Sequence, residues 1–98
     1  MTKAYVIADI EVTDPDAYED YKRLSTQAAE LYGARFLVRG GAAERLEGDR
    51  EPQRLVLLEF EDEGAARRWY DSPEYAEARA IRQEAASTRF LLVSPPEA

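Results

Sequence analysis

The chain has 98 residues, of which 45% are hydrophobic and 34% are charged, so we expect a single folded domain over residues 1–98. Its 13 basic and 20 acidic side chains give a formal net charge of −7, which disfavours nucleic acid and anionic membrane surfaces as partners. The sequence contains no cysteine and no histidine, which excludes disulfides, thiol nucleophiles, histidine-based triads and the common ligand sets of zinc and haem.

A strand and a helix are predicted at the start of the chain. Residues Tyr5–Val12 alternate between an apolar face and a mixed face, which is the period of a strand. Asp14 followed by Pro15 predicts a helix N-cap with proline in the first turn. Apolar residues then recur at helical spacing until Gly33, a residue suited to the left-handed conformation that ends many helices.

The middle of the chain predicts two more strands. Ala34–Arg39 predicts the second strand, and the pair Gly40 and Gly41 is most simply a tight turn that ends it. A weaker extended segment is expected at Ala42–Leu46. Arg54–Phe60 has the composition and pattern of a third strand.

Two helical segments and a last strand follow. Asp62 predicts the cap of a short helix, and Ser72 followed by Pro73 predicts the start of another helix that runs to about Ala86. The last strand is expected at Thr88–Val93. This order predicts an α+β fold, a ferredoxin-like βαββαβ unit whose antiparallel sheet is covered by helices on one face.

The other face of this sheet is too apolar for contact with bulk water. Strict alternation assigns eight residues to the helix side: Val6, Ala8, Ile10, Phe36, Val38, Val56, Leu58 and Phe60. The opposite face then carries Tyr5, Ile7, Leu37, Leu55 and Leu57 together with the charged residues Asp9, Arg35, Arg39 and Glu59. Because apolar patches of this extent usually mark interfaces, we expect a homodimer with the two sheets packed face to face, a dimeric α+β barrel.

Several motifs resemble those of one uncharacterised bacterial family. The most specific is the run Trp69-Tyr70-Asp71-Ser72-Pro73-Glu74-Tyr75 with Arg82 downstream, and the Asp14-Pro15 helix start and Arg39-Gly40-Gly41 add to it. Together they resemble, over nearly the whole chain, the family catalogued as domain of unknown function 1330. The resemblance implies a dimeric α+β barrel, in a group that also includes cofactor-independent monooxygenases and small-ring isomerases. It implies no particular activity.

Five residues are candidates for binding a small ligand. Arg39 and Arg54 are candidate anchors for an anion. Trp69 and Tyr75 are candidates as well, although their spacing favours packing in the core. Arg82 has no carboxylate three or four residues away on its helix, so it is either solvated or meets a strand carboxylate or an anionic ligand. The tyrosines of the first helix, Tyr18 and Tyr21, are interpreted as core or pocket wall rather than as catalytic phenols.

Asp9 and Glu59 are the candidate catalytic residues. Each interrupts an apolar strand face, where a carboxylate must be paired, hydrogen-bonded or raised in pKa, and the last condition often makes a general base. Two classes of function stay open. The protein binds or transforms a small organic, anionic molecule in a pocket between sheet and helices, or it is a non-catalytic homodimeric module whose charges form interchain salt bridges.

The absent residue types also set expectations for cofactors and compartment. Without histidine or cysteine, we expect no cofactor and no tight binding of zinc, copper or haem by side chains, although carboxylates could hold a hard cation weakly. Lys3 and Lys22 are the sequence's two lysines, and neither is placed where a depressed pKa would favour Schiff-base chemistry. The stretch Met1–Val12 is too short and too charged for a secretion signal or a membrane span, so we expect a cytoplasmic protein.

Overall fold

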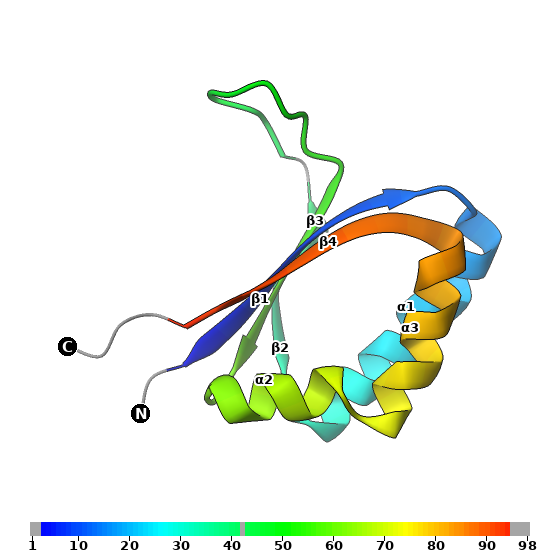
Figure 1. The fold of residues 1–98 in the computed structure, drawn as a ribbon, viewed down its shortest axis with the longest axis vertical. Helices are drawn as coiled ribbons and strands as arrows, with labels where there is room; N and C mark the ends of the chain where they lie inside the picture. Colours follow the sequence, from blue (N-terminus) through cyan, green and yellow to red (C-terminus); the bar gives the residue numbers. More distant parts are fainter. Residues whose placement is uncertain (1–2, 42, 95–98) are drawn as a thin grey trace.

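The computed structural model describes residues 3–41 and 43–94. Its elements, in chain order, are β1 (Ala4–Val12), α1 (Pro15–Leu31), β2 (Arg35–Gly41), β3 (Arg54–Phe60), α2 (Glu63–Tyr70), α3 (Pro73–Ala85) and β4 (Ala86–Val93). The strands form one antiparallel sheet in the order β2-β3-β1-β4, and the helices lie together on one side of it (Figure 1). The expected α+β, ferredoxin-like fold is confirmed.

The helix starts follow the signals in the sequence. At each N-cap a side-chain oxygen accepts a hydrogen bond from a backbone N–H three residues later: Asp14 from Ala17 at 3.2 Å, Asp62 from Ala65 at 2.8 Å and Ser72 from Tyr75 at 3.0 Å. Proline occupies the first turn of both α1 and α3. Beyond the end of α1, Gly33 has a φ of +75°, as expected for a left-handed residue after a helix.

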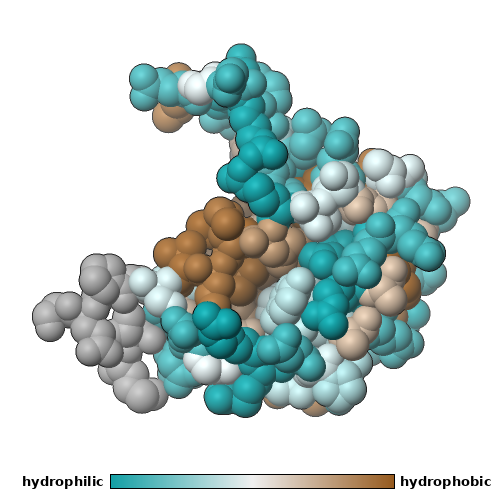
Figure 2. Space-filling view, viewed as in Figure 1, coloured by the Kyte–Doolittle hydropathy of each residue, from teal (hydrophilic) through white to brown (hydrophobic). Residues whose placement is uncertain are grey.

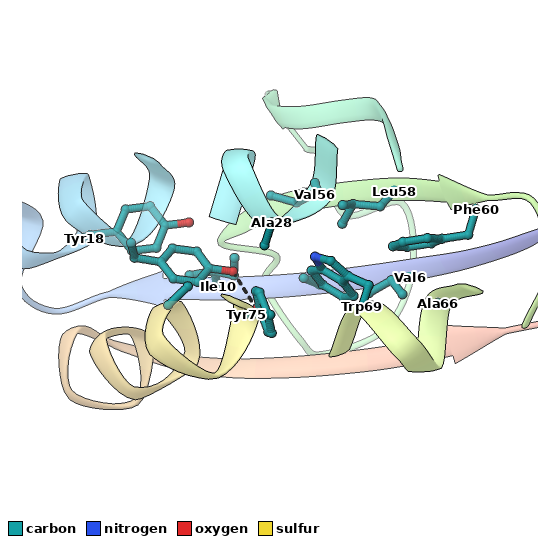
Figure 3. Packing of buried hydrophobic residues seen from close by; sticks show 14 of the residues in the cluster. Val6, Ile10, Tyr18, Ala28, Val56, Leu58, Phe60, Ala66, Trp69 and Tyr75 are labelled. Atoms are coloured by element: carbon teal, nitrogen blue, oxygen red, sulfur yellow. Dashed lines mark hydrogen bonds between the residues drawn. The ribbon is translucent and has the colours of Figure 1, made fainter. Parts of the chain in front are cut away.

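The core lies between the helices and the helix-facing side of β1 and β3. Val6, Ala8 and Ile10 of β1 are each at most 6% exposed, as alternation predicts. Trp69 of α2 lies near the middle of this layer, with its ring centroid 4.2 Å from that of Tyr75 and 5.3 Å from that of Phe60 (Figure 3). Contacts between buried aromatic rings therefore join α2 and α3 to the sheet.

A β-bulge in β2 makes part of the predicted face assignment wrong. Phe36 pairs with Leu58, but Val38 already pairs with Leu57, so Leu37 is an extra residue on the β2 side. The bulge turns Val38, which is 39% exposed, to the outer face, and it turns Arg39 to the helix side. Both residues had been expected on the opposite faces, because strict alternation assumes an unbroken ladder.

The boundaries of β2 and β4 also differ from expectation. Gly40 and Gly41 do not form the predicted turn, because β2 continues through Gly41, with a register irregularity and a φ of +76° at Gly40. Residues 43–46 of the expected extended segment form no strand, and Ala42 lies outside the described residues. β4 begins at Ala86, directly after α3 and two residues before the predicted start.

No helix covers the outer face of the sheet in the described part of the chain. Ile7 of β1 pairs with Leu57 of β3 and with Leu91 of β4, so these three apolar side chains form a row across that face. On the same face of β4, Leu91 and Val93, which pair with Ile7 and Tyr5, are 45% and 38% exposed. Figure 2 shows a hydrophobic area in the hollow between the β2–β3 loop and the helices.

None of the helices within residues 3–41 and 43–94 combines the length and the apolar character that crossing a membrane requires.

Candidate functional site

A small cavity lies between the sheet and the helices, where α1 crosses β1, β2 and β3. Its volume is about 20 Å³, which is room for one water molecule. Aromatic rings form much of its wall, and three cationic side chains border it. The lining residues are Ala8, Ile10, Tyr18, Tyr21, Lys22, Ser25, Phe36, Arg39, Arg54, Val56, Leu58, Trp69 and Phe90.

Lys22, Arg39 and Arg54 border both the cavity and an open groove outside it, and we call these three residues the cationic rim. The groove runs along α1, has a volume of about 560 Å³ and also contains Glu19 and Glu30. Because these three residues line both spaces, movement of their side chains would widen the connection between the cavity and the groove.

Arg54 reaches the rim from the start of β3. It pairs with Ile10 of β1, which places it on the helix side of the sheet, and its guanidinium carbon lies 5.6 Å from the ring centroid of Tyr18. Burial is the main cause that raises the pKa of Tyr18, and the neighbouring Tyr21 adds to it, whereas the nearby arginines act in the opposite direction. Tyr18 is therefore a neutral phenol at physiological pH.

Arg39 and Lys22 complete the rim from β2 and α1. Arg39 donates a hydrogen bond to the Thr26 hydroxyl and lies over the Phe36 ring, 4.3 Å from its centroid. Lys22 forms an ion pair with Glu19 at 3.0 Å. Within the described residues, the two rim arginines have no carboxylate partner.

The buried side-chain polar atoms that lack a hydrogen-bond partner within the described residues are all N–H donors. They are Nε of Arg54, Nε1 of Trp69, and Nε and Nη1 of Arg82. Arg54 and Trp69 line the cavity, while the Arg82 guanidinium lies over Phe90, 4.2 Å from the centroid of a ring that also lines the cavity. Buried donors without acceptors raise the free energy of the folded state, so this group of residues is suited to a ligand rich in acceptors.

Tyr75 and Arg82 lie behind the cavity wall rather than in it. The Tyr75 hydroxyl is hydrogen-bonded to the Tyr21 hydroxyl at 2.9 Å, and Tyr21 does line the cavity (Figure 3). Burial is the main cause that raises the pKa of Tyr75 far above its ordinary value. Arg82 is 4% exposed, so the guanidinium is directed inward rather than solvated.

Asp9 and Glu59 lie on the outer face, away from the five candidate ligand-binding residues. Asp9 accepts a hydrogen bond from the backbone N–H of Gln53 at 3.1 Å. Glu59 has ion pairs with Arg35 at 3.5 Å and Lys3 at 3.9 Å. The hypothesis that one pocket holds both the arginines and a base is therefore corrected. Successive residues of a strand face opposite sides of the sheet, so the two carboxylates and the cavity lie on different sides of β1 and β3.

Lys22, Ser25 and Phe90 line the cavity but were not proposed as site residues from the sequence. Lys22 is four residues after Tyr18 on α1, which places both on one helix face, and this spacing could have indicated it. Phe90 alternates onto the helix side of β4 opposite Ala8, but only the register shows that it reaches the cavity. Among the described residues, no group of three or more acidic side chains is placed to hold a metal ion.

Comparison with known proteins finds a family and a fold. The family model described as Domain of unknown function (DUF1330) matches residues 3–95. No curated protein matches the sequence.

Three solved structures illustrate the structural similarity. A protein of unknown function from Rhodopseudomonas palustris has a TM-score of 0.75 at 22% identity, over 99% of this chain and 85% of that one. A dimeric ferredoxin-like protein of unknown function from Thermobifida fusca has a TM-score of 0.65 at 18% identity, over 96% and 92%. SnoaB, a cofactor-independent oxygenase from Streptomyces nogalater, has a TM-score of 0.64 at 14% identity, over 100% and 97%. At these identities the similarity establishes the fold.

Proposed function

The chain belongs to the family of domain of unknown function DUF1330, and we propose that it binds a small planar organic anion, such as an aromatic carboxylate, in the cavity behind the cationic rim. The rings of Tyr18, Trp69 and Phe90 supply flat apolar walls. The rim arginines supply charge-assisted hydrogen bonds for a carboxylate.

The observation that carries this proposal is that the unsatisfied polar groups are all hydrogen-bond donors. Every buried polar side-chain atom without a partner in the described residues is a donor, and each belongs to a residue on the cavity wall or against it. The cavity lining contains no carboxylate. An anion in the cavity would offer acceptors to Nε of Arg54 and Nε1 of Trp69, which have none among the described residues.

Entry of a ligand requires the rim to move, because a cavity of about 20 Å³ is smaller than any organic anion. Arg54 and Arg39 are long side chains that also border the outer groove, so they can turn into it while remaining close to a carboxylate at the cavity mouth. The bound anion would then lie with its ring against the aromatic walls and its carboxylate within reach of the rim arginines.

A chemical transformation in this cavity would depend on stabilising an anion rather than on a carboxylate base. Asp9 and Glu59 face the other side of the sheet, and burial raises the pKa of Tyr18, which keeps that phenol neutral. The similarity in fold to a cofactor-independent oxygenase shows that this fold is compatible with enzymatic chemistry, but a fold alone assigns no reaction. We propose binding as the function and leave the reaction to be determined from the ligand.

Binding of benzoate, compared with that of its neutral isostere benzamide, tests this proposal. Trp69 is the protein's single tryptophan and lines the cavity, so its fluorescence reports on occupancy there. We expect benzoate to change the Trp69 emission and raise the melting temperature, and benzamide to do both more weakly. Arg54→Met should weaken benzoate binding about tenfold or more, the usual effect of losing a charge-assisted hydrogen bond.

The matched control is Arg68→Met, because Arg68 is an exposed arginine of α2 outside the cavity lining. It should leave benzoate binding unchanged. Equal binding of benzoate and benzamide, or equal loss in both variants, would contradict a site for anions.

A second candidate function, homodimerisation, is supported by the outer face of the sheet. We propose that two copies pack through the row of Ile7, Leu57 and Leu91, since no described helix covers it. The structural neighbour from Thermobifida fusca is a dimeric ferredoxin-like protein, which agrees with this arrangement. In such a dimer Asp9 and Glu59 would lie at the interface, as the sequence-based alternative of a non-catalytic module requires.

A further inference from the structure

The hydrogen bond between Tyr21 and Tyr75 can be assigned a direction. The two hydroxyl oxygens are 2.9 Å apart, and either oxygen could be the donor on distance alone. Tyr21 comes from α1 and is 6% exposed, whereas Tyr75 comes from α3 and is fully buried. The two ends of the bond therefore have different surroundings.

The two directions differ in where the accepting hydroxyl can place its own proton. In the described residues the Tyr75 hydroxyl has one hydrogen-bond partner, Tyr21. If Tyr75 accepted from Tyr21, its own proton would be buried without an acceptor, which is unfavourable. Tyr21 lines the cavity, so its proton can point there and meet a water molecule or a ligand.

The charge of Arg82 favours the same direction. Arg82 is buried and near enough to Tyr75 for its positive charge to lower the energy of a negative charge on that oxygen. A cation beside a hydroxyl attracts the oxygen and repels the proton, so the Tyr75 proton is directed away from Arg82. The acceptor available to it is Tyr21.

We infer that Tyr75 donates to Tyr21, so that Tyr21 presents its own hydroxyl proton to the cavity and selects ligands that carry a hydrogen-bond acceptor. Tyr21 is then a ligand-binding residue, and Tyr75 is a positioning residue that acts through it. Donation from Tyr75 also polarises the Tyr21 hydroxyl and strengthens it as a donor. The choice of ligand rests on the proposed function, whereas the direction of the bond is a property of the protein alone.

Neutron diffraction from crystals of the deuterated protein tests the direction without any ligand. We expect the Tyr75 deuteron to lie on the line to the Tyr21 oxygen and the Tyr21 deuteron to point elsewhere, toward the cavity. A Tyr21 deuteron on the line to Tyr75 would overturn the inference. This result does not depend on whether benzoate binds.

Binding of benzoate and toluene tests the consequence for ligands, because toluene has the same ring but no acceptor. Tyr21→Phe should weaken benzoate binding about tenfold, the effect of one lost hydrogen bond to a charged group, with toluene unchanged within about twofold. Tyr75→Phe should weaken benzoate binding by a smaller factor, about twofold to fivefold, with toluene again unchanged.

The control is Tyr32→Phe. Tyr32 directly follows α1 in the chain but does not line the cavity, and its hydroxyl donates a hydrogen bond to Glu74 at 2.8 Å. It should leave both ligands unaffected. If Tyr21→Phe weakened the binding of benzoate and toluene equally, Tyr21 would contribute packing only, and its role as a hydrogen-bond donor would be overturned. If benzoate does not bind the unaltered protein, the proposed function fails, and the neutron result still decides the direction of the bond.

Discussion

Gly40 of β2 and the guanidinium of Arg54 on β3 are so close that a Cβ added at Gly40 would lie 2.4 Å from both Cζ and Nη1 of Arg54. Gly40 also has a φ of +76°, which residues other than glycine rarely adopt. The glycine therefore has two functions: it allows the irregular backbone of β2, and it leaves room for the arginine at the rim.

Gly40→Ala should separate these effects when it is compared with Gly33→Ala. Gly33 has a nearly identical φ of +75°, but nothing lies within 4 Å of a Cβ there. Both variants should lose about 1 kcal/mol or more of unfolding free energy from backbone strain. Only Gly40→Ala should also weaken benzoate binding, measured by Trp69 fluorescence. Equal binding in the two variants would show that Arg54 reaches the ligand without the space beside Gly40.

Arg82→Met should leave the free energy of unfolding unchanged or raise it by up to about 2 kcal/mol. The substitution removes a buried cation whose Nε and Nη1 have no acceptor in the described residues, and it keeps an apolar side chain over Phe90. Urea denaturation measures the change. The comparison variant is Arg79→Met in the same helix. Arg79 donates to the Tyr70 carbonyl oxygen at 2.9 Å, so its loss should cost about 1 kcal/mol. A large loss in Arg82→Met would mean that Arg82 has a partner in the assembled protein.

Ser72→Ala should lower the melting temperature by several degrees, since it removes the N-cap of α3. The Ser72 hydroxyl accepts from the Tyr75 N–H at 3.0 Å and donates to the Trp69 carbonyl oxygen at 2.8 Å, with 4% of the residue exposed. Loss of such a cap costs about 1–2 kcal/mol. Ser87→Ala, an exposed serine on β4, is the control and should change little. Similar melting temperatures for both variants would show that the cap contributes nothing.

Leu57→Asp should convert a dimer into monomer or aggregate, because it places a charge in the apolar row of the outer face opposite Ile7. Light scattering of the unaltered protein at micromolar concentration should give about twice the 11.1 kDa chain mass. Leu46→Asp changes a leucine that is 88% exposed in the β2–β3 loop, and it should leave the dimer intact. A monomer before any substitution would rule out the face-to-face arrangement.

Local signals in the sequence were enough to predict most elements and the fold. The caps at Asp14, Asp62 and Ser72 are formed within three residues of the chain, so their geometry is a local property. The alternation of Val6, Ala8 and Ile10 likewise follows from the strand backbone itself. Arg54, Trp69, Tyr75 and Arg82 could be named as candidates, but their grouping around one cavity could not.

What only the tertiary structure decided is which side chains meet. The bulge at Leu37 arises from the pairing of β2 with β3, and it turned Arg39 toward α1 against the pattern of its own segment. Tyr21 and Tyr75 meet although 54 residues separate them. Periodicity specifies the face of each element independently, whereas register, bulges and helix packing depend on contacts between segments distant in the chain, and the cavity with its unpaired donors is a product of those contacts.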